Sequence, residues 1–95
     1  MKATVMNETL SQLMVMTGRT GRYKISSGQT ATGFIQCVYA KENDFIFGSG
    51  CEVDEGDAPD EGEIVEQGDF DFAPFTKIVC ESGSAYLYGY NISVE

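Results

Sequence analysis

The sequence contains no histidine. Histidine is the commonest general base and zinc ligand, and it is the side chain that ordinarily titrates near neutral pH. Without it the chain has no Ser/His or Cys/His pair for nucleophilic catalysis, and neither a P-loop nor a GxGxxG motif occurs. We therefore expect a protein that is not an enzyme and that has no catalytic residue, no cofactor and no metal site.

Basic residues are scarce: 6 Lys and Arg stand against 15 Asp and Glu, which gives a formal net charge of −9. An acidic surface repels nucleic-acid phosphates and anionic lipids, so we expect neither a nucleic acid nor a membrane as partner. No apolar run approaches the ~18 residues of a transmembrane helix. A secretory signal is not evident either, because Glu8 interrupts the apolar residues that follow Lys2. These features predict a soluble chain that is made in a cytoplasm.

Cysteine is sparse and odd in number: the chain has Cys37, Cys51 and Cys80. A secreted domain that is stapled by disulfides carries an even and denser set. We therefore expect reduced thiols, with Cys37 and Cys80 as small apolar residues of the core. Both lie in strand-like runs, so a single Cys37–Cys80 bridge stays open as an alternative.

The clearest pattern in the sequence lies in residues 74–91. Side chains of two kinds alternate through residues 76–81, which is the period of two expected of a strand. The tripeptide Ser82-Gly83-Ser84 supplies a turn, because glycine reaches positive φ without a Cβ clash. A second alternation puts Ala85, Leu87 and Gly89 on one face and, on the other, Tyr86, Tyr88 and Tyr90. The segment predicts a β-hairpin.

Three more segments have the composition of short strands: residues 22–25, 33–41 and 44–47. The second of these is apolar on both faces, which is typical of a central strand. Its alternation assigns one face to Ile35, Cys37 and Tyr39 and the other to Phe34, Gln36 and Val38. No long helical pattern occurs. In a chain of 95 residues this predicts one all-β domain over residues 1–95, a small antiparallel β-sandwich or jelly-roll-like fold.

Residues 1–18 are apolar and fit two structures. Asn7 can cap a short helix over residues 7–14, with Gly18 as its stop signal. The same residues also alternate in a way that fits an extended arm. We favour the short helix, and in either form we expect the segment to dock on its own domain or on a neighbouring subunit.

Residues 52–71 form the most biased segment, since ten of the twenty are Asp or Glu. Three residues, Gly56, Pro59 and Gly62, keep its first half from regular structure, and the pair Ile64-Val65 fits a short strand. We expect a solvated acidic loop that faces outward. Calcium binding in this loop is an alternative, although the spacing of the carboxylates does not match an EF-hand.

Two groups of residues are candidates for a contact surface. The first is the stripe Tyr86, Tyr88 and Tyr90, because tyrosine offers a large apolar ring with a polar tip. The stripe packs either a second layer of the domain or an interface with another subunit. The second is the basic pair Arg19 and Arg22, together with Lys24. In a homo-oligomer this basic stretch would face the acidic loop of a neighbour and set its register.

Several stretches resemble small virion proteins of tailed bacteriophages. They are Asn7-Glu8-Thr9-Leu10, then Tyr23, Ser27-Gly28 and Thr32-Gly33-Phe34, and above all Phe75-Thr76-Lys77-Ile78 followed by Ser82-Gly83-Ser84-Ala85-Tyr86. The matching stretches lie in both halves of the chain and skip the acidic loop. The resemblance implies a structural protein of the capsid exterior, either a decoration or cement protein or a head-fibre or tail-associated piece, built as a trimer. It carries over no functional residues.

The expected function is therefore a decoration or cement protein that binds the major capsid protein or another virion protein as a homotrimer. A small β-domain with exposed edges and many aromatic side chains gains stability by closing on copies of itself. Two alternatives stay open: a receptor- or glycan-binding module of a phage fibre, and an acidic regulator that binds basic partners or mimics DNA. The expected location is the virion, after synthesis in the host cytoplasm.

Overall fold

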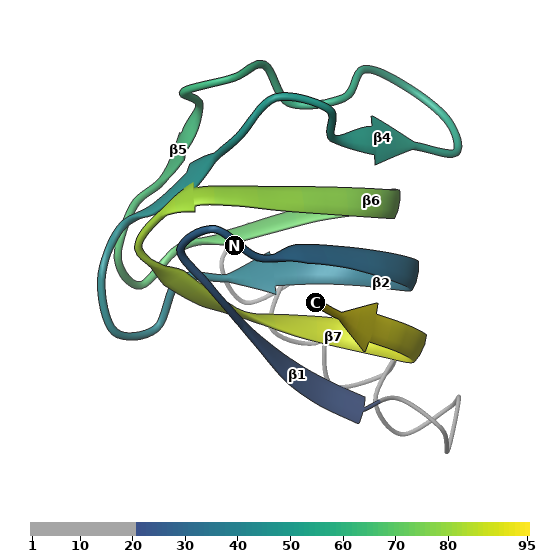
Figure 1. Ribbon diagram of the computed structural model, residues 1–95, viewed down its shortest axis with the longest axis horizontal. Coiled ribbons are helices and arrows are strands. Elements are labelled where there is room, and N and C mark those ends of the chain that lie inside the picture. Colours follow the sequence, from purple (N-terminus) through teal and green to yellow (C-terminus); the bar gives the residue numbers. More distant parts are fainter. Residues whose placement is uncertain (1–20) are drawn as a thin grey trace, which may run out of the picture.

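The computed structural model describes residues 21–95, so the helix or arm predicted for residues 1–18 and the candidate Arg19 lie outside the described residues. Residues 21–95 form seven strands: β1 (Gly21–Ser26), β2 (Thr30–Tyr39), β3 (Phe45–Phe47), β4 (Glu52–Val53), β5 (Ile64–Val65), β6 (Phe70–Ser82) and β7 (Ser84–Val94). All pairings are antiparallel, in the order β1-β7-β2-β6-β3-β5 with β4 added to β6 (Figure 1). The part of the chain that the structure describes has no helix long and apolar enough to cross a membrane.

The predicted hairpin over residues 74–91 is wrong. Both of its arms are strands, but β2 lies between them and pairs with β6 on one side and β7 on the other. Gly83, at φ 82°, turns the chain sharply, and the Ser84 N–H donates to Asn43 Oδ1 at 2.9 Å. The turn is therefore a corner that carries the chain across the end of the sheet. Alternation identifies strands, whereas their partners depend on contacts distant in sequence.

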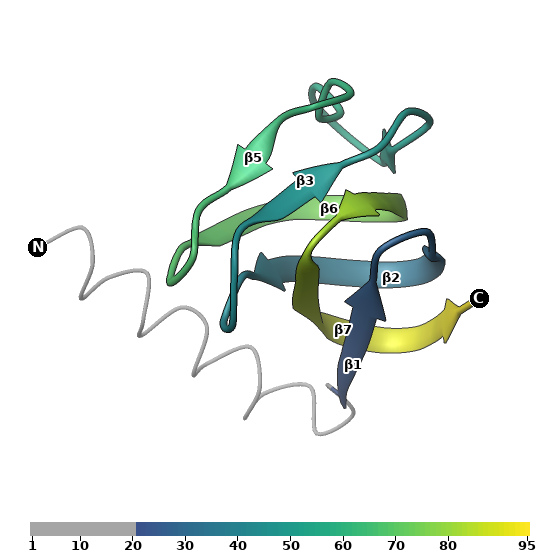
Figure 2. The same cartoon turned by 60° about the vertical axis from the view of Figure 1, so that its left-hand side comes forward.

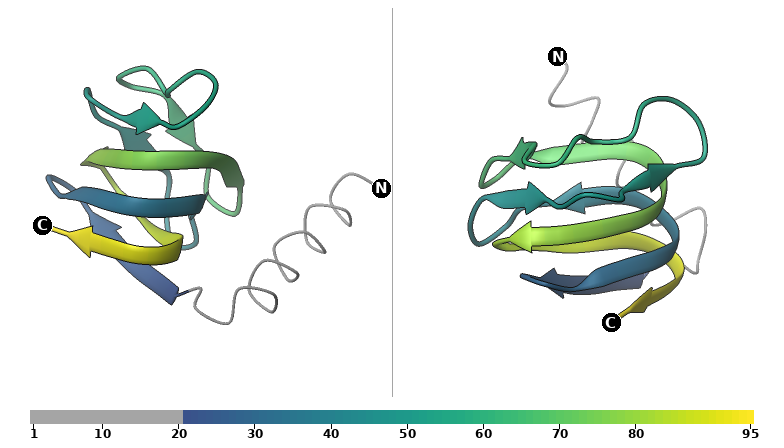
Figure 3. Two further views of the ribbon diagram at one scale, coloured as in Figure 1. Left: turned by 90° about the vertical axis from the view of Figure 1, so that its right-hand side faces the viewer. Right: turned by 45° about the horizontal axis from the view of Figure 1, so that its top comes forward.

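The sheet coils over on itself because its central strand is bent. The pairing of β2 shifts register after Thr32 and again between Ile35 and Cys37, and such bulges bend and twist a strand. The long strand β6 pairs first with β2 and then, from Cys80 onward, with β3. Figures 2 and 3 show the result, with β1, β3 and β5 lying obliquely across β2, β6 and β7. The predicted all-β, sandwich-like fold is confirmed for residues 21–95.

The core lies between these two parts of the sheet. Strands on each side contribute to it, for example Ile25 and Phe45 from one side and Ile35, Phe75 and Leu87 from the other. Each buried side chain of this size contributes roughly 1.5–3 kcal/mol to folding. A backbone contact closes the structure further, since the Gly28 N–H donates to the Cys80 carbonyl at 2.9 Å and the Cys80 N–H to the Gln29 carbonyl at 3.0 Å.

The strand predictions hold to within a few residues for β1, β2 and β3, and the pair Ile64-Val65 forms β5 as expected. The single acidic loop predicted for residues 52–71 is corrected, because its two ends are strands β4 and β6 and β5 divides its middle. Two acidic loops remain, residues 54–63 and 66–69. Val65 is buried in the core and anchors β5 there, which explains how so acidic a segment is held in place.

A candidate aromatic interface

The face of β2, β6 and β7 that points away from the core is rich in aromatic rings. We call this set the aromatic face; its members are Phe34, Tyr39, Phe70, Phe72, Tyr86, Tyr88 and Tyr90. Strand register places them side by side, since Tyr39 pairs with Tyr86 on one side and Phe70 on the other, and Phe34 pairs with Tyr90. Directly opposed residues of neighbouring strands share a face of the sheet. The predicted stripe of β7 is thus part of a wider surface.

Five of the seven rings of the aromatic face stack with nearly parallel planes, in two separate groups. Tyr39 and Phe70 have centroids 4.4 Å apart and planes inclined by 9°, while Phe34 and Tyr90 are 4.9 Å apart at 13°. Phe72 extends the first pair, at 5.8 Å and 17° from Phe70. All are half-buried except Phe34, which is 55% exposed. Such rings offer apolar area to water in a connected surface rather than singly.

Sequence alternation missed part of this surface. It put Phe34 and Tyr39 on opposite faces, whereas the bulge between Ile35 and Cys37 brings both to the outer face. The same bulge explains why Cys37 and Val38 are both fully buried, Val38 in the core and Cys37 on the outer side between Tyr88 and Phe72. A bulge adds one residue to a strand and reverses the alternation beyond it. The sequence does contain a signal for Phe70 and Phe72: the two rings are two positions apart, which places both on one face of a strand.

Positive charges gather at one edge of the aromatic face, around Tyr86. The Arg22 guanidinium carbon lies 4.4 Å from the centre of the Tyr86 ring, and the ammonium groups of Lys24 and Lys41 lie 5.8 Å from it. Lys24 also forms an ion pair with Glu42 at 3.0 Å, and this partner raises the pKa of Lys24. The structure therefore joins two predicted candidates, Tyr86 and Arg22, in one contact.

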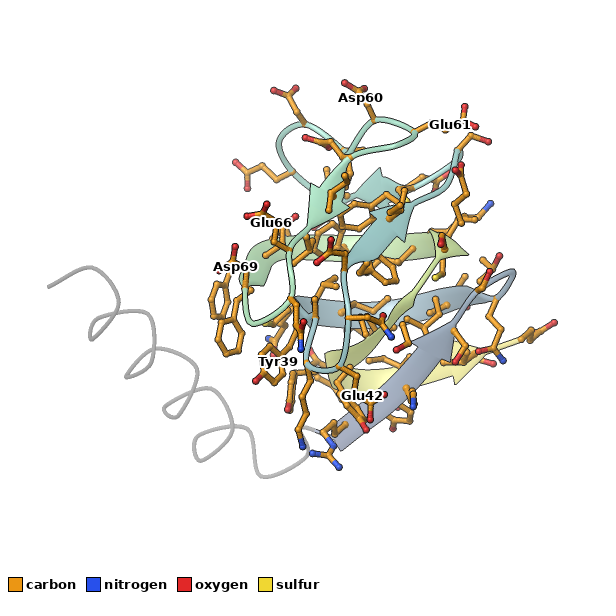
Figure 4. The ribbon with its side chains drawn as sticks, turned by 90° about the vertical axis from the view of Figure 1, so that its left-hand side faces the viewer. Tyr39, Glu42, Asp60, Glu61, Glu66 and Asp69 are labelled. Carbon is orange, nitrogen blue, oxygen red and sulfur yellow. The ribbon has the colours of Figure 1, made fainter. Side chains whose placement is uncertain are left out.

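Negative charges lie mainly elsewhere. Figure 4 shows Asp60 and Glu61 at one end of the molecule and Tyr39 and Glu42 toward the other. A hollow of about 510 Å³ in the acidic region is lined by carboxylates that include Glu63 and Asp71, and burial, followed by the charge of Glu63, raises the pKa of Asp71. Within residues 21–95 no three Asp, Glu or Cys side chains converge closely enough to hold a metal ion. The calcium alternative thus gains no support from the geometry.

The three cysteines are free thiols and all are buried, so the Cys37–Cys80 bridge is not formed. Cys37 and Cys80 are both buried apolar residues as predicted. Cys80 belongs to the main core cluster, and Cys37 lies on the outer side of the sheet between Tyr88 and Phe72. Burial is the main cause that raises the pKa of Cys37 to about 12 and that of Cys80 to about 11, and it also raises the pKa of Cys51. A thiol that stays protonated at neutral pH is a poor nucleophile. Burial therefore makes all three thiols packing groups rather than activated nucleophiles.

A small hollow of about 220 Å³ opens at the end of the aromatic face opposite the basic edge. Phe34 and Tyr90 line it together with Gln36, Pro74 and Thr76, and with Asp54 from the loop after β4. The Asp54 N–H donates to the Pro74 carbonyl at 2.8 Å, which fixes this loop at the rim. No sequence motif marks this site, because its residues come from three strands and a loop.

Comparisons with protein-family models, with curated proteins and with solved structures gave no match to this chain. The function is therefore argued from the chain's own surface. Two features of that surface stand out: a broad aromatic face with a basic edge, and a hollow at the other end of the same face that carries polar side chains. The first is large and connected, as a protein contact is, and the second is small and concave, as a ligand site is.

Proposed function

We propose that this chain is a structural protein of a tailed-bacteriophage virion, which binds the capsid exterior as a homotrimeric decoration or cement protein. The observation that carries the proposal is the aromatic face. Its half-buried rings cover three adjacent strands on the side away from the core. Aromatic residues are enriched at protein interfaces, and connected apolar patches on a small domain mark interaction sites.

Association with a partner would bury the aromatic rings that the single domain leaves exposed to water. Tyr39, Phe70 and Phe72 already stack on one another, so a partner surface could cover these three rings without rearranging them. Tyrosine and phenylalanine lose few rotamers on burial, which limits the entropic cost of the contact. A symmetric assembly of three copies on a capsid gains further from many contacts acting together.

The charge distribution supports an outward position and a defined register. A net charge of −9 disfavours contact with packaged DNA. The basic edge at Arg22 and Lys41 and the acidic loop of residues 54–63 are opposite in sign, and in an oligomer one could face the other. Exposed ion pairs contribute only about 0–1 kcal/mol each, so they would orient the subunits while the rings hold them together.

The test is the mass of the protein in solution, measured by light scattering during gel filtration. The proposal predicts about three times the chain mass of 10.4 kDa. The double variant Phe72→Ser/Tyr88→Ser should elute as a folded monomer, because both substitutions remove rings from the aromatic face. The matched control is Ile64→Ser, which removes a side chain that is 55% exposed on β5 and should leave the trimer intact.

A second measurement tests whether the protein binds to capsids. Purified protein is mixed with DNA-filled capsids of the phage whose genome encodes it and then sedimented. The parent chain and Ile64→Ser should pellet with the capsids, whereas Phe72→Ser/Tyr88→Ser should stay in the supernatant. A parent chain that remains monomeric and stays in the supernatant would overturn the proposal.

A further inference from the structure

The hollow beside Phe34 combines an aromatic wall with polar groups around it. Phe34 and Tyr90 stack at 4.9 Å with planes inclined by only 13°, and Phe34 is one of the two large apolar side chains in residues 21–95 that are strongly exposed. The bulge next to Phe34 turns its ring outward while Ile35 enters the core. A flat exposed ring of this kind is a platform for another flat apolar face.

Polar groups stand around this platform. The Gln36 side chain lines the hollow, and its Oε1 atom is buried and has no hydrogen-bond partner. An unpaired buried acceptor costs free energy that a donor would recover. Oε1 is buried as it stands, and rotation of the amide, which exchanges Oε1 and Nε2, would turn the other group toward a ligand. Asp54 adds acceptors and Thr76 a hydroxyl on the other side.

This combination selects one class of ligand. A pyranose ring has an apolar C–H face that covers an aromatic ring and hydroxyl groups at its edge that both donate and accept. Charge narrows the class, because Asp54 at the rim and the net charge of −9 disfavour phosphates and acidic sugars. Size narrows it again, since about 220 Å³ lies below the ~300–1,000 Å³ of sites that enclose drug-sized ligands.

We infer that this hollow binds one ring of a neutral saccharide. The ring stacks on the free face of Phe34, whose other face packs against Tyr90, while Gln36 exchanges hydrogen bonds with its hydroxyls and Asp54 and Thr76 contact its far edge. This inference does not rest on the virion proposal. The hollow belongs to a single subunit and lies at the end of the aromatic face away from Tyr86, so a partner that covers Tyr39, Phe70, Phe72 and Tyr88 can leave it open.

The experiment is a titration of the ¹⁵N-labelled full chain with neutral saccharides, including glucose, galactose, mannose and N-acetylglucosamine with their short oligomers. Sialic acid is the charged comparator. At least one neutral sugar should shift the backbone amides of Phe34, Gln36, Thr76 and Tyr90 and leave those of β5 in place. We expect a Kd on the order of 1 mM, so titration to about 50 mM reaches saturation.

Substitutions test whether binding depends on the Phe34 ring and on Gln36. Phe34→Ala should weaken binding at least tenfold, Phe34→Tyr should restore it, and Gln36→Leu should weaken it several-fold. Ile64→Ser is the matched control, because Ile64 is as exposed as Phe34, at 55%, but lies on β5 outside the aromatic face, and it should bind like the parent chain. Phe34 is 55% exposed, so its replacement should leave the fold intact, which the unshifted spectrum of the core reports.

Three results would overturn the inference. One is the absence of any shift at these amides with every neutral saccharide up to about 50 mM, where a Kd of ~1 mM would be saturated. Another is a preference for sialic acid over the neutral sugars. The third is Phe34→Ala binding as tightly as the parent chain. Trimer formation or capsid binding can fail without touching any of these outcomes, so the two proposals are tested separately.

Discussion

The two faces of β2, β6 and β7 carry different kinds of side chain and have different roles. On the inner face aliphatic residues and phenylalanines are sealed from water, and Leu87 and Ile78 are 0% exposed. On the outer face the aromatic rings are half-buried, although they belong to the same strands. Neighbouring residues such as Leu87 and Tyr88 therefore lie in different surroundings, one buried and the other half-exposed. The inner face makes the domain fold, and the outer face is free to make contacts.

The outer face is also the more polar of the two. Each tyrosine there carries a hydroxyl that water can reach, Arg22 lies over Tyr86, and Gln36 interrupts the aromatic face near its other end. A face made to be buried within one chain would not need these groups, because each costs free energy when it loses water without a partner. The mixture is typical of a surface that alternates between solvent and a partner.

The strongest test of the difference between the two faces compares Leu87 with Tyr88, which are adjacent on β7. Leu87→Ala should lower the free energy of unfolding by about 2–5 kcal/mol, since it opens a cavity in a packed core. Tyr88→Ala should lower it by about 1 kcal/mol, because that ring is half-exposed. Urea denaturation measures both under conditions that keep the chain monomeric. Equal losses would show that the outer ring is as much a part of the core as Leu87.

The corner between β6 and β7 gives the second test, because it sends the two strands to opposite sides of β2. Gly83 has φ 82°, and a Cβ there would overlap the Asp44 carbonyl oxygen. Gly83→Ala should therefore cost about 2–3 kcal/mol of unfolding free energy. Gly28→Ala is the control, since Gly28 has φ 86° but no atom within 4 Å of an added Cβ. It should cost about 1 kcal/mol, again by urea denaturation; a cost as large as that of Gly83→Ala would contradict the role of the close approach to Asp44.

The smallest expected effect concerns a charge at the rim of the inner face. Burial, and then the charge of Glu63, raises the pKa of Asp71 above its usual value of 3.8, so the folded chain holds this proton more tightly than the unfolded one. Stability from this group is present below pH 3.8 and is lost as the pH rises through the folded pKa. Asp71→Asn should raise the melting temperature at pH 7, and the gain should vanish below about pH 3.8. A gain that is constant from pH 3 to pH 7 would contradict the shift.

Most strand positions could be predicted from the sequence, and their partners could not. The period of two located β2, β6 and β7, because alternation is a local property of an extended chain, and residue composition located β1 and β3. The local pattern failed at Gln36, where one extra residue reverses the faces, and at residues 82–84, where a tight turn suggested a hairpin. Both failures concern β2, whose place between β6 and β7 is decided by contacts far apart in sequence, from Tyr39 with Phe70 to Ala31 with Val94.

The residues of the candidate site also fall into two groups: those that the local sequence pattern identified and those that it could not. The tyrosines of β7 were found because they repeat every second residue on one strand, and their shared face follows from backbone geometry alone. Phe34, Gln36 and Thr76 could not be found that way, since they meet only after β2 takes its place between β6 and β7 and bends. Local sequence thus settles which residues are extended and which of them share a strand face. Long-range pairing settles which strands become neighbours, because the free energy of that choice comes from burying distant side chains together.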